Sequence, residues 1–200
     1  NNGAGVTYIF YGFAEVNDVT PFNLDEPPSP VTKIFSNSAA SNLGGSVSTG
    51  DVNNDGYTDL IIGANRATPL GRQYAGESYI VYGYEEIIYQ QNIDLGSITE
   101  NLTKIYGVKA GDQSGTSVFC DDIDSDGFDD VIIGAPLADP ALRYSAGETY
   151  IVYGSALLKD ETSIDLYESN LPLTRIYGDY SNGKSGWNIS TADFNGDGAK

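Results

Sequence analysis

A short loop beginning at Asp122 has the residue types and spacing of a metal-binding site. Acidic side chains stand at alternate positions, at Asp122, Asp124 and Asp126. Carboxylates spaced in this way can converge on one centre and supply the hard oxygen ligands that Ca²⁺ prefers. Gly127 permits a sharp reversal of the chain, after which the Phe128 carbonyl and Asp130 would complete the cage. We therefore predict that this loop binds Ca²⁺.

The loop begins as an EF-hand loop does but closes earlier. An EF-hand requires Glu at its twelfth position, and that position here is Ile133. Closure by Asp130, at the ninth position, gives a shorter loop. The apolar run from Asp130 to Gly134 is typical of a β-strand. The loop is therefore expected to join two strands rather than two helices.

The same pattern occurs three times at a constant interval. The three loops begin at Asp51, Asp122 and Asp193, so each follows the previous one by 71 residues. One such loop is also compatible with a solvated turn rich in Asp and Asn. Three of them in a fixed register favour a repeated metal site, and Ca²⁺ is the cofactor that we expect.

The composition excludes several classes of function. The chain has 200 residues and a formal net charge of −18, which disfavours nucleic acid and anionic membrane surfaces as partners. It contains no histidine, so it lacks the means for Ser-His-Asp or Cys-His catalysis and for imidazole ligation of zinc. The one cysteine, Cys120, has Thr49 and Thr191 at its register positions and is expected to be a buried small side chain. We predict that the chain is not an enzyme.

The 71-residue register covers the whole chain. It divides the sequence into the end of one blade-like unit, two complete units and the start of another, at residues 1–40, 41–111, 112–182 and 183–200. Lys200 stands one residue short of the expected closing Asp of the third loop, and the chain does not begin with Met. We therefore expect this sequence to be a segment of a longer protein.

Each complete unit contains four candidate strands. In the first unit they lie at residues 46–50, 59–64, 78–82 and 103–106, and the first strand of the third unit is expected at 188–192. A helical period is present only weakly, at residues 84–91. Four short antiparallel strands at a fixed period predict all-β, β-propeller blades, with the calcium loop between strands one and two. A solenoid is the main alternative, but its repeats are usually shorter.

The segments around the acidic loops resemble a known repeat. Gly-Ser-Val and Gly-Thr-Ser-Val precede the first two loops, and Gly63–Ala64–Asn65 and Gly134–Ala135–Pro136 follow them. This pattern resembles FG-GAP repeats, the blades of the integrin α-subunit N-terminal propeller. The Phe of the FG pair is replaced, by Leu43, Ser114 and Ser185. The resemblance implies a seven-bladed ring with calcium in the hairpins between strands one and two, and adhesion to a partner through the opposite face.

The resemblance also implies the metal ligands of each loop. In the first loop they are Asp51, Asn53, Asp55, the Tyr57 carbonyl and Asp59. In the second loop they are Asp122, Asp124, Asp126, the Phe128 carbonyl and Asp130. The third set begins with Asp193, Asn195 and Asp197.

Two further motifs concern the surface. Asn101–Leu102–Thr103 and Asn188–Ile189–Ser190 match the N-glycosylation sequon, so Asn101 and Asn188 are candidate glycosylation sites of a glycoprotein. Arg66, Arg72, Tyr74, Arg143 and Tyr144 fall in loops at the end opposite the calcium loops, and we expect them to be solvated.

Three functions remain open. The first is a calcium-binding extracellular propeller segment that mediates adhesion or recognises a protein or glycan. The second is a structural repeat protein of an extracellular coat, stalk or filament, which would assemble with copies of itself. The third is a non-catalytic accessory propeller of a larger secreted enzyme. A secreted or cell-surface location suits all three, because extracellular calcium is high enough to fill even weak sites. We expect no nucleic-acid partner and no membrane insertion by this segment.

Overall fold

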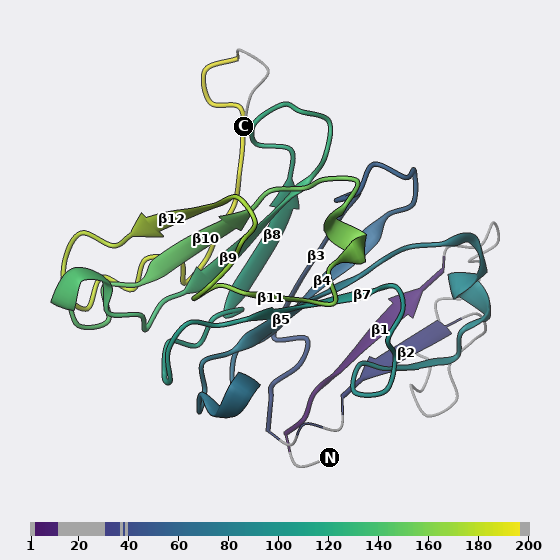
Figure 1. Cartoon of the computed structure of the whole chain (residues 1–200), viewed down its shortest axis with the longest axis horizontal. Helices are drawn as coiled ribbons and strands as arrows, with labels where there is room; N and C mark the ends of the chain where they lie inside the picture. The colour runs from purple at the N-terminus through teal and green to yellow at the C-terminus, as the bar shows by residue number, and fades with distance from the viewer. Residues whose placement is uncertain (1–2, 12–30, 37, 39, 197–200) are drawn as a thin grey trace, which may run out of the picture.

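The computed structural model describes residues 3–11, 31–36, 38 and 40–196, which form an all-β arrangement of three sheets (Figure 1). The first complete unit forms an antiparallel sheet whose strands are β3 (Ser46–Gly50), β4 (Asp59–Ala64), β5 (Glu77–Val81) and β7 (Leu102–Tyr106). The second unit repeats it with β8 (Ser117–Asp121), β9 (Asp130–Ala135), β10 (Glu148–Val152) and β12 (Leu173–Tyr177). A smaller sheet contains β1 (Val6–Phe10) and β2 (Val31–Phe35). The prediction of four-stranded antiparallel units is confirmed.

The central strands of each unit are formed by runs of branched apolar residues. Both β4 and β9 contain two consecutive isoleucines, and β9 is buried along its whole length. β-Branched side chains favour the extended backbone and pack well on a pleated surface. Strands that are covered on both faces can be apolar throughout.

Two short strands were not predicted. β6 (Asn92–Asp94) pairs in parallel with β2, and β11 (Ser163–Asp165) pairs in parallel with β7. Each of them lies in the long connection after strand three of one unit and extends the sheet of the preceding unit. With β11 added, the first complete sheet has five strands, in the order β11-β7-β5-β4-β3.

Short 3₁₀ turns occupy the connections. They are η1 (Pro69–Gly71), η2 (Glu85–Tyr89), η3 (Pro140–Leu142) and η4 (Leu158–Asp160). The weak helical period at residues 84–91 corresponds to η2, which is a 3₁₀ turn without a side-chain cap. No side chain caps the first N–H groups of this turn. Because 3₁₀ helices are generally short, the turn does not extend into a longer helix.

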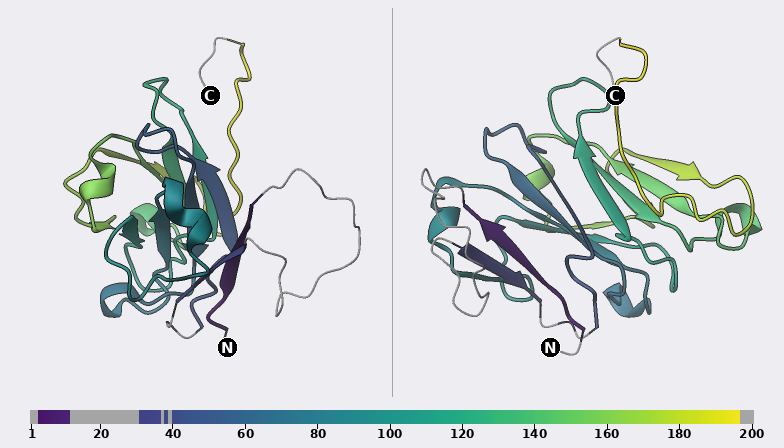
Figure 2. Two further views of the ribbon diagram at one scale, coloured as in Figure 1. Left: turned by 90° about the vertical axis from the view of Figure 1, so that its right-hand side faces the viewer. Right: turned by 180° about the vertical axis from the view of Figure 1, so that it is seen from behind.

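The first strand of the third unit is expected at residues 188–192, but the structure has no strand there. The segment still runs along β8, because Ser117 Oγ donates to the Gly186 carbonyl at 2.8 Å and the Thr191 hydroxyl donates to Asp121 (Figure 2). Strand one of the other two units forms a ladder with its own strand two. No described residue supplies a strand two for this segment, so it lacks the ladder that would define a strand.

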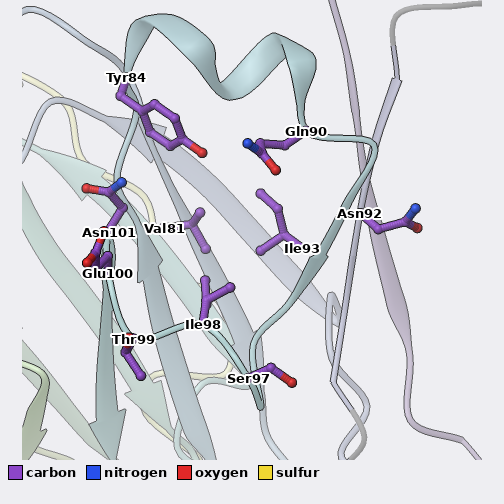
Figure 3. A pocket seen from close by; sticks show the side chains of 10 residues that line it. All are labelled: Val81, Tyr84, Gln90, Asn92, Ile93, Ser97, Ile98, Thr99, Glu100 and Asn101. Atoms are coloured by element: carbon purple, nitrogen blue, oxygen red, sulfur yellow. The ribbon is translucent and has the colours of Figure 1, made fainter.

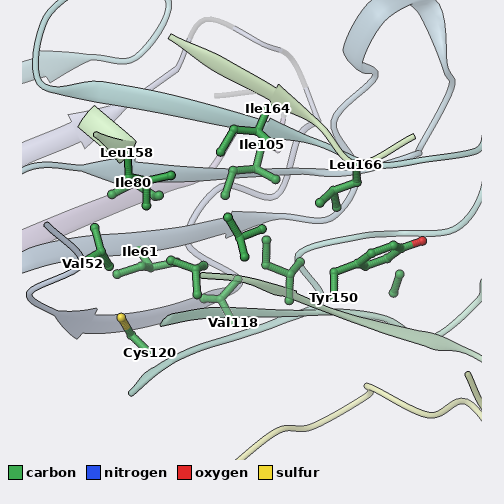
Figure 4. Close-up of a cluster of buried hydrophobic side chains, with 14 of the residues drawn as sticks. Val52, Ile61, Ile80, Ile105, Val118, Cys120, Tyr150, Leu158, Ile164 and Leu166 are labelled. Atoms are coloured by element: carbon green, nitrogen blue, oxygen red, sulfur yellow. The ribbon is translucent and has the colours of Figure 1, made fainter. Parts of the chain in front are cut away.

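The two complete sheets pack against each other over a shared core (Figure 4). Ile61 and Ile80 contribute from one sheet, and Val118 and Tyr150 contribute from the other. Cys120 is 7% exposed in the same cluster, which confirms its prediction as a buried small side chain. Strand one of the first complete unit, β3, lies beside strand one of the second, β8. The Val118 N–H donates to Ser46 Oγ at 3.0 Å. Successive sheets therefore stack like adjacent blades.

Candidate metal centre

The loop between β8 and β9 brings three carboxylates together. One oxygen from each of Asp122, Asp124 and Asp130 lies within 4.8 Å of the other two. Asp130 is buried, Asp122 is half-buried and Asp124 is exposed. The cluster therefore has a buried base and an open side toward solvent, as expected for a loop that takes up an ion from solution.

Backbone N–H groups fix the shape of this loop. The Asp126 and Gly127 N–H groups donate to the two oxygens of Asp122 at 3.1 and 3.0 Å, and the Phe128 N–H donates to Asp126 Oδ1 at 3.0 Å. Gly127 has a φ of 93°, a backbone conformation that would be strained for a residue with a side chain. The carboxylates are thus oriented by the chain that carries them, because Asp side chains bond readily to N–H groups a few residues ahead.

Asp130 is held at the base of the loop by two N–H groups from different segments. Ile123 donates to Oδ2 at 3.1 Å and Gly154 donates to Oδ1 at 2.9 Å. Burial raises the pKa of Asp130, and these two hydrogen bonds oppose that rise. The neighbouring charges of Asp124 and Asp126 raise the pKa further. A cation bound at this point would relieve the same repulsion.

The first loop, between β3 and β4, has the same frame. Asp51 accepts hydrogen bonds from the Asp55 and Gly56 N–H groups at 3.1 and 2.9 Å. Asp59 is fully buried and accepts from Val52 at 3.0 Å and from Gly83 at 2.9 Å. Burial raises the pKa of Asp59 to about 6.

The first loop is less negatively charged than the second, for two reasons. Asn53 stands where the second loop has Asp124, and its Nδ2 donates to Asp55 Oδ2 at 2.9 Å. The Lys159 ammonium lies 3.9 Å from the same Asp55 oxygen. Within the described residues, three acidic oxygens converge only in the second loop. Nothing in the sequence near the first loop had indicated Lys159, which comes from the connection of the next unit.

The third loop is described only at its beginning. The Gly196 N–H donates to Asp193 Oδ1 at 2.6 Å, and Asp193 and Asn195 are exposed. Asp197 lies outside the described residues. The backbone N–H groups of Tyr57 and Phe128 each donate to the Asp two residues earlier, and the role of their carbonyls as ligands stays a prediction.

The donor chemistry of the second loop fits a hard divalent cation. All the converging atoms are carboxylate oxygens, which suit Ca²⁺ or Mg²⁺ rather than softer metals. Cys120 lies in β8 just before the loop, but burial raises the pKa of its thiol, so it offers no thiolate. Zinc coordination by this loop is therefore disfavoured.

A separate pocket of about 310 Å³ lies under the connection from Tyr84 to Asn101 (Figure 3). Val81, Ile93 and Ile98 supply its apolar part, and the Tyr84 and Gln90 side chains supply polar groups (Figure 3). Asn101 is exposed beside this pocket, and Asn188 is exposed as well. The sequence predicts a strand that includes Asn188, and the structure has no strand there.

The described part of the chain contains no helix that combines the length and the apolar character needed to cross a membrane.

Comparison with known proteins identifies the repeat. The FG-GAP repeat model matches residues 43–81 and 114–152, so both matches begin at equivalent positions and each spans strands one to three of a unit. Each match includes one acidic loop.

Relatives fall into two groups. Phosphatidylinositol-glycan-specific phospholipase D of Bos taurus is 27% identical over 84% of this chain and 19% of its own length. Integrin alpha-PS2 of Drosophila melanogaster is 28% identical over 94% of this chain and 12% of its own length. Integrin alpha-PS5 of the same organism is 33% identical over 35% of this chain. The chain thus spans about a fifth or less of these relatives. It contains two FG-GAP repeats and is similar to integrin α chains.

Proposed function

We propose that this chain is a segment of an extracellular, calcium-binding FG-GAP propeller whose metal loops stabilise a surface that recognises a protein or glycan partner. The observation that carries the proposal is the convergence of Asp122, Asp124 and Asp130 in a loop that the backbone already shapes. The same spacing in the first loop and at the start of the third supports a repeated site.

Calcium would act by neutralising carboxylates that repel one another. Two of the acids at each loop are close in sequence, and the closing acid is buried against the next strand. Like charges at such short range destabilise the folded loop, and a divalent cation removes the repulsion. A ligand that binds only the folded state adds about 2.7 kcal/mol of stability at 100 times its dissociation constant. Asp130 and Asp59 would hold the ion to the sheet, because both accept N–H groups from the chain beyond strand three.

Integrin α relatives support the recognition function. Each contains a segment similar to this chain, and extracellular calcium is sufficient to fill weak sites. The proposed partner is a protein or a glycan, and the high negative charge argues against nucleic acid.

A second candidate is favoured by the other group of relatives. Proteins named phospholipase D contain a similar segment that makes up about a fifth of their length. In such a protein the repeats would form an accessory domain, and catalysis would reside elsewhere. On either reading this segment does no chemistry of its own. A structural array of repeats is the remaining alternative, and it would assemble from copies of the chain.

Calorimetric titration with Ca²⁺ and thermal unfolding in EGTA test the metal function. We expect Ca²⁺ to raise the melting temperature and Asp130→Asn to weaken binding at the second loop. Asp179→Asn removes the same charge at an exposed position outside the loops and serves as the control. Equal melting temperatures in Ca²⁺ and in EGTA would overturn the proposal.

A further inference from the structure

Two junctions between units are closed by an equivalent short strand. The connection of the following unit adds β6 to β2 and β11 to β7, both in parallel and in the same register, with Ile93 opposite Ile34 and Ile164 opposite Ile105. The backbone bonds repeat as well. The backbone N–H groups of Lys33 and Lys104 donate to carbonyls of the connection at 3.0 and 3.2 Å. The backbone N–H groups of Leu95 and Leu166, in the connection, donate to carbonyls of β2 and β7 at 2.9 and 3.1 Å.

A threonine on the edge strand also holds the connection. Thr32 Oγ1 donates to the Gln90 carbonyl at 2.5 Å, and Thr103 Oγ1 donates to the Glu161 carbonyl at 2.5 Å. Apolar side chains of the connection complete the contact, because Leu158, Ile164 and Leu166 are buried beside Ile105 in the core (Figure 4).

An arginine fastens the second junction. The Arg72 guanidinium donates to both oxygens of Asp165, from Nη1 at 2.8 Å and from Nη2 at 2.6 Å, and Nη1 also donates to the Gly107 carbonyl at 2.8 Å. The guanidinium lies 5.8 Å from the Tyr167 ring centre. A bidentate pair with this geometry is strong and directional. The ion pair lowers the pKa of Asp165 accordingly.

The outer edge of the second complete sheet has every element of this junction except the added strand. β12 is the edge strand of that sheet in the described chain. Ile176 is 48% exposed, although its register equivalents Ile34 and Ile105 are 0% and 1% exposed. Thr174 occupies the place of Thr103 and bonds to Tyr153, as Thr103 bonds to Tyr82.

Arg143 occupies the place of Arg72. The backbone N–H groups of Arg72 and Arg143 close equivalent 3₁₀ turns, with bonds to Pro69 and Pro140 at 2.7 and 2.9 Å. Within the described residues the buried Arg143 Nε has no hydrogen-bond partner, and its guanidinium forms no ion pair. At the equivalent junction Arg72 binds Asp165 through Nη1 and Nη2, so Arg143 lacks the carboxylate that Arg72 has.

We propose that the β12 edge and Arg143 form an acceptor site for the connection of another FG-GAP unit. The occupant is an extended segment of the form polar–Ile–Asp–Leu, which adds in parallel to β12, covers Ile176 and pairs its Asp with Arg143. A second copy of this chain does not supply it, because both such segments, β6 and β11, are already paired with their own sheets. The loop arginines therefore fasten units together, whereas the sequence had suggested that they are solvated.

The test measures binding of a labelled peptide with the sequence of residues 155–168 to the intact 200-residue chain by fluorescence anisotropy at physiological salt. Two variant peptides carry the Asp165→Asn or the Asp160→Asn change, which remove the same charge at different positions. We expect saturable binding of the parent peptide and about tenfold weaker binding of the Asp165→Asn peptide, which equals about 1.4 kcal/mol. The Asp160→Asn peptide should bind as the parent does.

Two chain variants complete the test. Arg143→Gln should weaken the parent peptide about tenfold and should abolish the difference between the parent and Asp165→Asn peptides. It should leave the melting temperature nearly unchanged, whereas Arg72→Gln should lower the melting temperature and leave peptide binding intact. Absence of saturable binding at millimolar peptide, or equal binding to the parent and Arg143→Gln chains, would overturn the proposal. Sedimentation showing dimers that Arg143→Gln dissociates would also overturn it, because a second copy would then be the occupant.

Discussion

Asp129 and Asp51 bond to each other in both directions and so join two candidate metal loops. The Asp51 N–H donates to Asp129 Oδ2 at 2.8 Å, and the Asp129 N–H donates to the Asp51 carbonyl at 3.1 Å. Asp51 is the first candidate ligand of one loop, and Asp129 directly precedes the last candidate ligand of the next. The loops of successive units are therefore held in a fixed relation at their bases.

Replacing Asp129 with Ala should destabilise the chain by about 1–2 kcal/mol, because the half-buried Asp51 N–H would lose a charged acceptor. Urea unfolding in EGTA measures the change without a contribution from metal. Thr58→Ala is the control, since Thr58 is the exposed register equivalent of Asp129, and it should shift stability by no more than about 0.5 kcal/mol. Equal losses for the two variants would show that the link between the loops contributes nothing.

The acidic content of the two complete loops predicts different calcium affinities. The second loop has Asp124 where the first has Asn53, and Lys159 lies near the first loop alone among the described loops. Because ligand charge tunes Ca²⁺ affinity, the second loop should bind more tightly. Asp124→Asn replaces a charged ligand with a neutral one and should weaken calcium binding at the second site about tenfold. Asn53→Asp makes the opposite exchange and should strengthen binding at the first site by about the same factor.

Calorimetric titration resolves the two sites through these exchanges. Lys159→Gln should also strengthen the first site, because it removes a competing positive charge 3.9 Å from Asp55. A single affinity class that none of the three changes alters would contradict this interpretation.

The raised pKa of Asp59 predicts opposite effects of pH with and without calcium. In EGTA the folded chain keeps a proton on Asp59 up to about pH 6, whereas the unfolded chain releases it near 3.8. The folded state then binds more protons between these values, so the free energy of unfolding should fall as pH rises from about 4 to about 6. With calcium present, proton and metal compete for the same carboxylate, and calcium affinity should fall as pH drops below about 6.

Urea unfolding at a series of pH values in EGTA tests this prediction, with calcium titrations over the same range. Asp59→Asn removes the titrating group and should flatten the pH dependence in EGTA. Part of the slope should remain, because burial also raises the pKa of Asp112 to about 6. A slope of the same size in Asp59→Asn would assign the whole effect to other groups.

The sequence predicted the repeated elements well, because their signals are local. Apolar runs such as 130–135 and the spacing of the acidic loops place strands one to four within a residue or two of their observed bounds. The parallel strands β6 and β11 were missed for a physical reason. Three residues with one apolar side chain have no period of their own, and they become strands only through hydrogen bonds to another unit.

Side-chain contacts between units could not be predicted from the sequence either. Arg72 and Asp165 are 93 residues apart, and nothing local distinguishes their charges from solvated ones. The contact of Lys159 with Asp55 is of the same kind. The 71-residue period did contain a usable signal, however, because Arg72 and Arg143 share one register position and so do Asp94 and Asp165.

Glycines set how closely successive sheets approach. A Cβ atom on Gly63 would lie 2.2 Å from the Gly115 carbonyl oxygen, which belongs to the next unit. Backbone at this distance cannot move aside without shifting the whole sheet, so Gly63→Ala should destabilise the chain by about 1–3 kcal/mol, as overpacking does. Gly96→Ala is the control, because its Cβ would meet only the Asp94 side chain, at 3.2 Å. Urea unfolding compares the two variants. Because Gly→Ala by itself stabilises a chain by restricting its unfolded state, a loss as large for Gly96→Ala as for Gly63→Ala would show that the contact between units is not the cause.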